Sequence, residues 1–336
     1  EQLRRCHRML APVSRMRRPD ISNAVRFVEN LLAFNLGRLQ TVRSIGVGEM
    51  AAFLHDPGEY SLAEKRLVLG GATFQRGLAA VRTGGPEALT EIAALERLET
   101  RIWHIGALQL RAHHHLWRGE EEEARRVWSE AELEFVRLGS LWQLEAVHHA
   151  SACVTAAFCG DALGLKRHIE VLARQVAAGL DYRAHLDVAR GEHARLRGDL
   201  DGALRAIEAG LAGLPAGEGL IRPWAETARI EVLLARGDIE QARAAARACI
   251  EDVDDDHQQI SFRVRAIRSL ALAECAAGEP DIAAARLDRA IEDVEASANP
   301  LLLGALWEAR AQVALAVGNA SQAAHAAGQA EFWYRP

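Results

Sequence analysis

Histidine is the residue type in this sequence best suited to chemistry at neutral pH. His113, His114 and His115 are consecutive, and His104, His148 and His149 lie nearby in the chain. Imidazole nitrogens bind transition metals and move protons. Side chains at adjacent positions of a helix point about 100° apart. Side chains at positions i and i+4 lie on the same face and can bind one metal ion, which adjacent ones cannot do in this way. We therefore expect these histidines to pack or to face solvent, and we predict no metal site and no cofactor.

Other charged runs also lack a catalytic pattern. "EDVDDD" at Glu251 has neither the glycine nor the final glutamate of a calcium loop. The glutamates from Glu120 onward begin a predicted helix, where the helix dipole favours acidic side chains. No G-x-x-x-x-G-K-[ST] phosphate loop is present, and no nucleophile is spaced with a base. The sequence predicts no catalytic residues, so we expect a protein that is not an enzyme.

A short repeated phrase marks the elements that would position any binding residues. "RGDLDGA" at 197 has relatives "RGEEEEA" at 118 and "RGDIEQA" at 236, and the same glycine recurs at intervals of 41, 38, 39, 41 and 40 residues. A period of this size predicts stacked helix pairs, with the glycine in the turn between a first helix A and a second helix B. The six turn glycines are Gly119, Gly160, Gly198, Gly237, Gly278 and Gly318.

Small residues recur at fixed distances from these glycines. Helices joined by a short turn approach closely only where side chains are short, and glycine tolerates the left-handed conformation at a helix end. The unit around Gly160 departs from the pattern, with Lys166 and Leu172 taken as its helix B positions, so we expect its packing to be the least secure. The small residues in the other units include Ala112, Gly191, Ala271 and Ala311 in helix A and Ala124, Ala131, Ala203, Gly210, Ala242, Ala283, Ala290, Ala323 and Ala330 in helix B.

This pattern of a small residue, a turn glycine and two more small residues resembles the tetratricopeptide repeat, whose usual period is about 34 residues. The longer period is similar to the helical-repeat regions of large bacterial regulators and kinases related to the maltose activator. The resemblance covers roughly residues 64 to 334 and implies a right-handed superhelical α-solenoid. A capping box at Ser61 to Glu64 and a turn at "TGGPEA" add an earlier unit, for about seven antiparallel pairs.

Composition and charge agree with an all-α protein. Aromatic residues make up 5% of the chain, the net charge is −6, and the five cysteines form no C-x-x-C pair. We expect a tetratricopeptide-like repeat array over residues 61–336 and an irregular N-terminal helical cap or linker over residues 1–60. The absence of an apolar leader predicts a cytoplasmic protein. The preference for arginine over lysine suggests a bacterial source. The net charge argues against nucleic-acid or membrane partners.

The expected function is to bind a protein or peptide partner as a scaffold, in the sensory or assembly module of a larger bacterial signalling protein. The alternative is a small-molecule effector sensor that controls oligomerisation of attached domains, which a closed pocket lined by Trp224, Arg265 and Arg268 would favour. Self-association through the C-terminal helix, which ends in Phe332, Trp333 and Tyr334, is a further expectation. The resemblance implies a concave groove formed by Gln109, His113, His185, Glu192, Trp224, Thr227, Glu231, Arg265, Arg268, Glu308 and Gln312.

Overall fold

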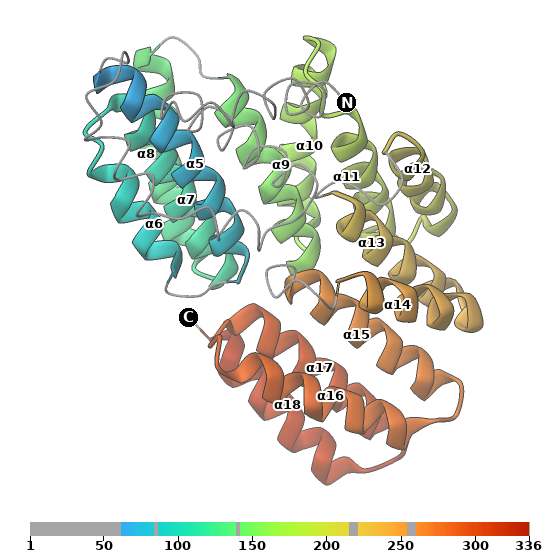
Figure 1. The fold of residues 1–336 in the computed structure, drawn as a ribbon. Coiled ribbons are helices and arrows are strands. Elements are labelled where there is room, and N and C mark those ends of the chain that lie inside the picture. Colours follow the sequence, from blue (N-terminus) through green and yellow to red (C-terminus); the bar gives the residue numbers. More distant parts are fainter. Residues whose placement is uncertain (1–61, 84–86, 139–141, 215–220, 254–259, 336) are drawn as a thin grey trace, which may run out of the picture.

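Every regular element of the computed structural model is an α-helix within the described residues, which are 62–83, 87–138, 142–214, 221–253 and 260–335 (Figure 1). This confirms the all-α class and the array of antiparallel helix pairs. Helix A precedes helix B in each pair. The pairs are α5 (Leu62–Thr83) with α6 (Glu87–Glu96), α7 (Arg101–Trp117) with α8 (Glu121–Leu138), α9 (Trp142–Cys159) with α10 (Ala162–Ala177), α11 (Arg183–Leu196) with α12 (Leu200–Ala212), α13 (Ile221–Arg236) with α14 (Ile239–Val253), α15 (Ile260–Ala276) with α16 (Pro280–Glu295), and α17 (Pro300–Ala316) with α18 (Ala320–Tyr334).

The first pair begins where the capping box predicts it, at Leu62. The cap or linker predicted for residues 1–60 lies outside the described residues. No helix in the described ranges combines the length and the apolar character needed to cross a lipid bilayer.

The repeated phrase forms the turn of each hairpin. The six turn glycines all have positive φ, between 71° and 85°, which confirms the left-handed conformation expected of them. In "RGDLDGA", the amide of Asp199 donates to the carbonyl of Ala194 at 3.0 Å, which closes α11. The Asp199 carboxylate then accepts from the amide of Gly202 at 2.9 Å and starts α12. One phrase therefore ends a helix and begins the next.

Small residues bring the two helices of a hairpin together, as the spacing predicts. A Cβ on Gly191 would lie 2.5 Å from Ile207 and 2.9 Å from the carbonyl oxygen of Ala203. A Cβ on Gly210 would lie 2.7 Å from Val188. Both approaches are too close for a larger side chain, so glycine at these positions permits the crossing of α11 and α12.

The unit around Gly160 differs from the sequence interpretation. Leu165, five residues after Gly160, is fully buried, whereas Lys166, the next residue of α10, is exposed. Leu172 is also fully buried. The choice of Lys166 as the packed position was therefore wrong. This hairpin buries leucines where the hairpins around the other turn glycines bury alanine, glycine or, at Cys249, cysteine.

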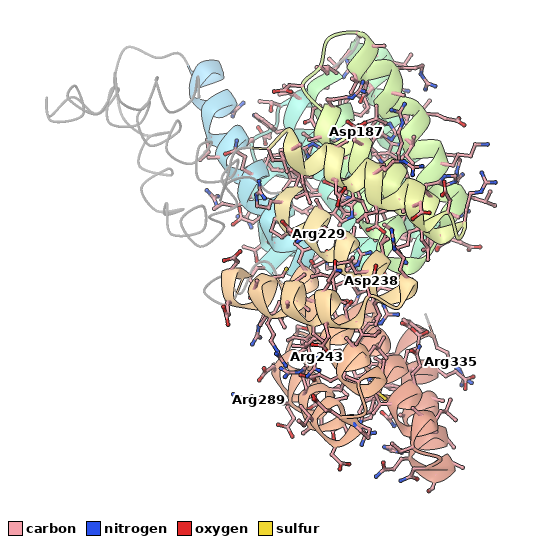
Figure 2. All side chains as sticks on the ribbon, turned by 90° about the vertical axis from the view of Figure 1, so that its right-hand side faces the viewer. Asp187, Arg229, Asp238, Arg243, Arg289 and Arg335 are labelled. Atoms are coloured by element: carbon pink, nitrogen blue, oxygen red, sulfur yellow. The ribbon has the colours of Figure 1, made fainter. Side chains whose placement is uncertain are left out.

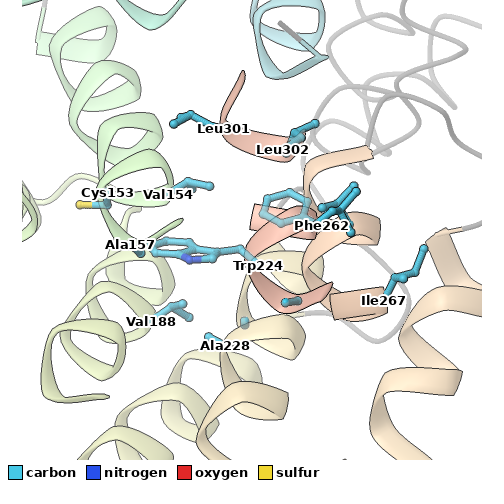
Figure 3. Packing of buried hydrophobic residues seen from close by; sticks show 14 of the residues in the cluster. Cys153, Val154, Ala157, Val188, Trp224, Ala228, Phe262, Ile267, Leu301 and Leu302 are labelled. Carbon is cyan, nitrogen blue, oxygen red and sulfur yellow. The ribbon is translucent and has the colours of Figure 1, made fainter. Parts of the chain in front are cut away.

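The array curves until its last pair lies beside an early one (Figure 1). Leu301 at the start of α17 lies 3.6 Å from the place where a Cβ on Gly119 would stand, in the turn between α7 and α8. Trp117 belongs to the same buried cluster as Leu301 and Leu302. Figure 3 shows Trp224 in this cluster. The last pair consequently covers part of the inner side of the array.

Candidate functional site

The inner side of the array contains a cavity of about 990 Å³. Residues of the A helices α7, α9, α11, α13, α15 and α17 line it, together with residues of α8, α10 and α18. Binding sites for small molecules usually have volumes of about 300–1,000 Å³. The cavity is therefore large enough for an organic ligand and has walls from both ends of the array.

A buried network of charged residues lies beside the cavity and joins three A helices. Arg265 of α15 donates to Glu192 of α11 at 2.5 Å and to Glu231 of α13 at 2.8 Å. Arg195 pairs with the same two carboxylates, at 2.9 Å and 3.2 Å. The indole of Trp224 donates to Glu192 at 3.0 Å. Because Glu192 is 0% exposed and Arg265 is 2% exposed, these charges depend on one another for compensation.

The electrostatic balance keeps the network ionised. Burial alone would raise the pKa of Glu231, but the charge and hydrogen bonds of Arg265 outweigh it and hold that pKa at about 2. The pKa of Glu192 is lowered for the same reasons, with Arg265 and Arg195 opposing the effect of burial. Burial would lower the pKa of Arg265, and the two carboxylates raise it instead. The network is therefore charged throughout the physiological pH range.

Three arginines of the cavity wall retain hydrogen-bonding capacity. The Nε of Arg268 is buried and has no hydrogen-bond partner among the described residues. Its nearest carboxylate oxygen, on Glu231, is 3.9 Å from Nη1. Arg125 and Arg167 also line the cavity, and both are exposed to solvent. These guanidinium groups can donate to an anion in the cavity.

Most carboxylates of the wall have partners inside the protein. Asp161 caps α10 by accepting from the amide of Gly164 at 2.8 Å. Glu132 accepts from the Trp128 indole at 2.8 Å. The hydroxyl of Tyr334 lies 3.4 Å from Glu308. Uncharged donors of this kind do not cancel the charge of a carboxylate, so the wall carries both acidic and basic side chains.

Histidines form a second group on the wall. His148 and His149 of α9 and His168 of α10 all line the cavity. His113 packs against His148, with ring centroids 4.8 Å apart, whereas His115 binds Glu120 and His104 is exposed. The consecutive run 113–115 is thus divided among different surroundings, as its helical spacing predicts.

The predicted groove residues divide into those that line the cavity and those that lie outside it. Arg265, Arg268, Glu231 and Glu308 line it. The polar side chains of tightly packed A helices point toward neighbouring helices, which is why several others are buried rather than in contact with solvent. Of the predicted groove residues that lie outside the cavity, His185 is half-buried beside Tyr182 and Gln312 is exposed. The buried ones are Gln109, His113, Glu192, Trp224 and Thr227.

Sequence reasoning missed several wall residues because it considered only helix A. Arg125, Arg167 and His168 belong to B helices. His149 and His168 are 11 residues before and 8 residues after Gly160, and an antiparallel hairpin brings such positions together. The hairpin register was therefore the signal that could have found His168.

The described residues form an all-helical array of hairpins with a cavity on its inner side. No protein-family model matches the chain, and no curated protein matches it.

Proposed function

We propose that this chain is an effector-sensing module that binds a small organic anion in its central cavity. The observation that carries the proposal is the buried Nε of Arg268, which has no hydrogen-bond partner among the described residues and belongs to a wall that Arg125 and Arg167 also line. An unpaired buried donor is costly, and a carboxylate or phosphate of a ligand would satisfy it. This favours the small-molecule alternative over the peptide scaffold.

The remaining wall indicates that the ligand has an organic body. Leu116, Leu234, Leu272 and Leu301 line the cavity beside the arginines. Contact with these leucines would add apolar burial to the charged hydrogen bonds. A free inorganic anion would leave those side chains uncovered, so a carboxylate or phosphate ester with an apolar or neutral portion fits better.

The position of the cavity supports a role in sensing. Arg125 belongs to α8, whereas Tyr334 belongs to α18, and both line the cavity. A ligand that contacts both would stabilise the closed arrangement of the array over any more open one. Domains attached to this module could respond to that change by altering their oligomerisation. The resemblance to the tetratricopeptide regions of bacterial regulators is part of this proposal. The turn glycines and the fixed spacing of small residues around them support it.

A peptide partner is the second candidate, because the cavity lies at the upper end of the size range for small-molecule sites. The C-terminal carboxylate of a peptide would then bind Arg268, with its last side chains against the leucines. A peptide amide would lack this charge and should bind much more weakly than the free acid.

Titration calorimetry of the full chain tests the proposal. The probes are citrate, glucose 6-phosphate and AMP, with glucose and adenosine as neutral counterparts, and a tetrapeptide acid with its amide. We expect at least one small anion to bind saturably and its neutral counterpart not to bind. Binding of the peptide acid alone would select the second candidate, and binding of no acid would refute both.

Arg268→Gln and Arg289→Gln form the variant pair. Arg289 of α16 is exposed at the edge of the molecule, as is Arg335 after α18 (Figure 2). Arg286 is unsuitable as a control because it donates two hydrogen bonds to the buried Glu274. Loss of a charge-assisted pair worth about 1.5–3 kcal/mol should weaken anion binding at least about tenfold in the Arg268 variant only. Equal affinities in the two variants would refute the assignment of Arg268.

A further inference from the structure

Three histidines from one hairpin converge on the cavity wall. His148 and His149 are consecutive in α9, and His168 lies on α10. One imidazole nitrogen from each lies within 4.8 Å of the other two. The Nδ1 atoms of His149 and His168 are hydrogen-bonded to each other at 3.0 Å, so one of the two carries a proton. The three nitrogens therefore lie close together although adjacent helical positions diverge.

These separations agree with the needs of a tetrahedral zinc site. Zinc–nitrogen bonds of about 2.0–2.1 Å place two nitrogen ligands about 3.3 Å apart. The His149–His168 separation is close to this value. The His148 nitrogen lies up to 4.8 Å from the others, so the rings of His149 and His168 would rotate toward it to close a gap of about 1.5 Å on binding.

The three rings are present in the form that binds metals. Burial is the main cause that lowers the pKa of His149 to about 3 and of His168 to about 4. Burial also holds the pKa of His148 well below its usual range. Each ring is therefore neutral at pH 7, and binding of a metal through both Nδ1 atoms would move the proton of the His149–His168 hydrogen bond to an Nε2 nitrogen.

Packing fixes His148 and leaves one of its nitrogens without a partner. Trp128 stacks on the ring with an interplanar angle of 4° and a centroid distance of 3.2 Å, and His113 packs against it as well. The Nδ1 of His148 is buried and has no hydrogen-bond partner among the described residues. A buried polar atom of this kind calls for a ligand, and the stacking would hold the ring ready for one.

We propose that His148, His149 and His168 together bind one divalent transition-metal ion, for which Zn²⁺ is the best fit. Three nitrogen ligands favour Zn²⁺ and its borderline neighbours over Mg²⁺ and Ca²⁺, which prefer oxygen. Because all three rings line the cavity, the fourth coordination position faces the cavity. Water or an oxygen of a cavity ligand would occupy it. The site does not depend on the proposed effector.

Nearby charges modulate this site. Arg174 acts on His149 and Arg167 acts on His168, and both positive charges oppose the binding of a cation. Asp161 acts on His168 in the opposite sense. The arginines also favour an anionic fourth ligand, because its charge would be shared between the metal and the guanidinium groups.

Cobalt titration of the chelator-stripped full chain, without any organic anion, tests the proposal. We expect saturation at one Co²⁺ per chain with the visible absorption of a four-coordinate ion, displacement by Zn²⁺, and no displacement by Mg²⁺. Absence of saturable binding would overturn the proposal, and so would the weak absorption of a six-coordinate ion. An effector that binds the chain without metal would leave the proposed function intact in either case.

Variants locate the site. His149→Ala and His168→Ala should each weaken Co²⁺ binding by more than about tenfold, because loss of a direct ligand exceeds the effect of losing an outer-shell partner. His325→Ala, at an exposed position of α18, should bind as the wild type does. Unchanged affinity in the first two variants would overturn the assignment. If they fail to fold, as judged by circular dichroism, electron paramagnetic resonance of Cu²⁺ bound to the wild type decides, with coupling to three nitrogens supporting the site and fewer contradicting it.

Discussion

Removal of Arg265 should strongly destabilise the array. Its guanidinium compensates Glu192 and Glu231, and replacement by alanine leaves Arg195 as the remaining close partner of both carboxylates. Breaking a buried ion pair by deleting one member typically costs about 3–5 kcal/mol. Arg268 is 3.9 Å from Glu231 and compensates little of this loss. We therefore expect Arg265→Ala to lose about 3–5 kcal/mol of unfolding free energy.

Arg265 and Arg268 are expected from the sequence to lie in a concave groove. If Arg265 faced an open groove, reversal of Arg265 and Arg268 to glutamate would weaken partner binding and leave helicity intact. The structure places Arg265 in the protein interior, where glutamate would add a third carboxylate to Glu192 and Glu231. The reversal should thus reduce folding itself, so it cannot test binding.

Urea denaturation followed by circular dichroism measures the effect. Arg183→Ala is the matched control, because the Arg183–Asp187 pair has a 69% exposed arginine and is worth at most about 1 kcal/mol. The double variant Arg265→Met with Glu192→Gln removes one charge of each sign from the interior and should recover part of the loss. If Arg265→Ala and Arg183→Ala lose equal stability, or if the double variant is less stable than Arg265→Ala, the role assigned to the network is wrong.

Three further predictions concern stability. The pKa of Glu231 is about 2 in the folded protein against an ordinary value of 4.5. Its contribution of about 3 kcal/mol to the unfolding free energy is therefore complete above pH 4.5 and is lost as pH falls toward 2. When the unfolding free energy is measured as a function of pH, Glu231→Gln should lose less of it on acidification than the wild type. Ala203→Leu should overpack the α11–α12 crossing and reduce the unfolding free energy by about 1–3 kcal/mol. Lys166→Leu, at an exposed position, should change it by less than about 0.5 kcal/mol in the same urea assay. Comparable losses of stability in the two variants would contradict the hairpin register. Gly237→Ala should reduce the stability by about 1 kcal/mol in thermal melts. The φ of 83° is the cause, because nothing lies within 4 Å of the new Cβ. An unchanged melting temperature would show that the turn relaxes.

The hairpins could be predicted from the sequence because they depend on local chemistry. A turn glycine such as Gly198 and an adjacent cap such as Asp199 act within a few residues of each other. The closure of the array could not be predicted in this way. The closure results from small rotations between successive pairs, which add up along the array. No local sequence pattern predicts that Leu301 lies close to Gly119.

The candidate site was predicted in part. The offsets from the turn glycine found Arg268 and Glu308, which line the cavity, because helix periodicity fixes which face points inward. They did not reveal the burial of Glu192, whose ion pair with Arg265 spans 73 positions of sequence. His168 escaped because helix B positions near a hairpin turn were not considered.

The contact between Leu301 and Gly119 has a consequence for cooperativity. In an open repeat array each unit touches only its neighbours, so the ends fray independently and folding spreads from any point. Here the contact joins the seventh hairpin to the second, so loosening the last pair also exposes apolar surface near the start. The described hairpins should consequently unfold more nearly as a single unit than a linear array of the same length, and hydrogen exchange at α7 should be sensitive to substitutions in α17.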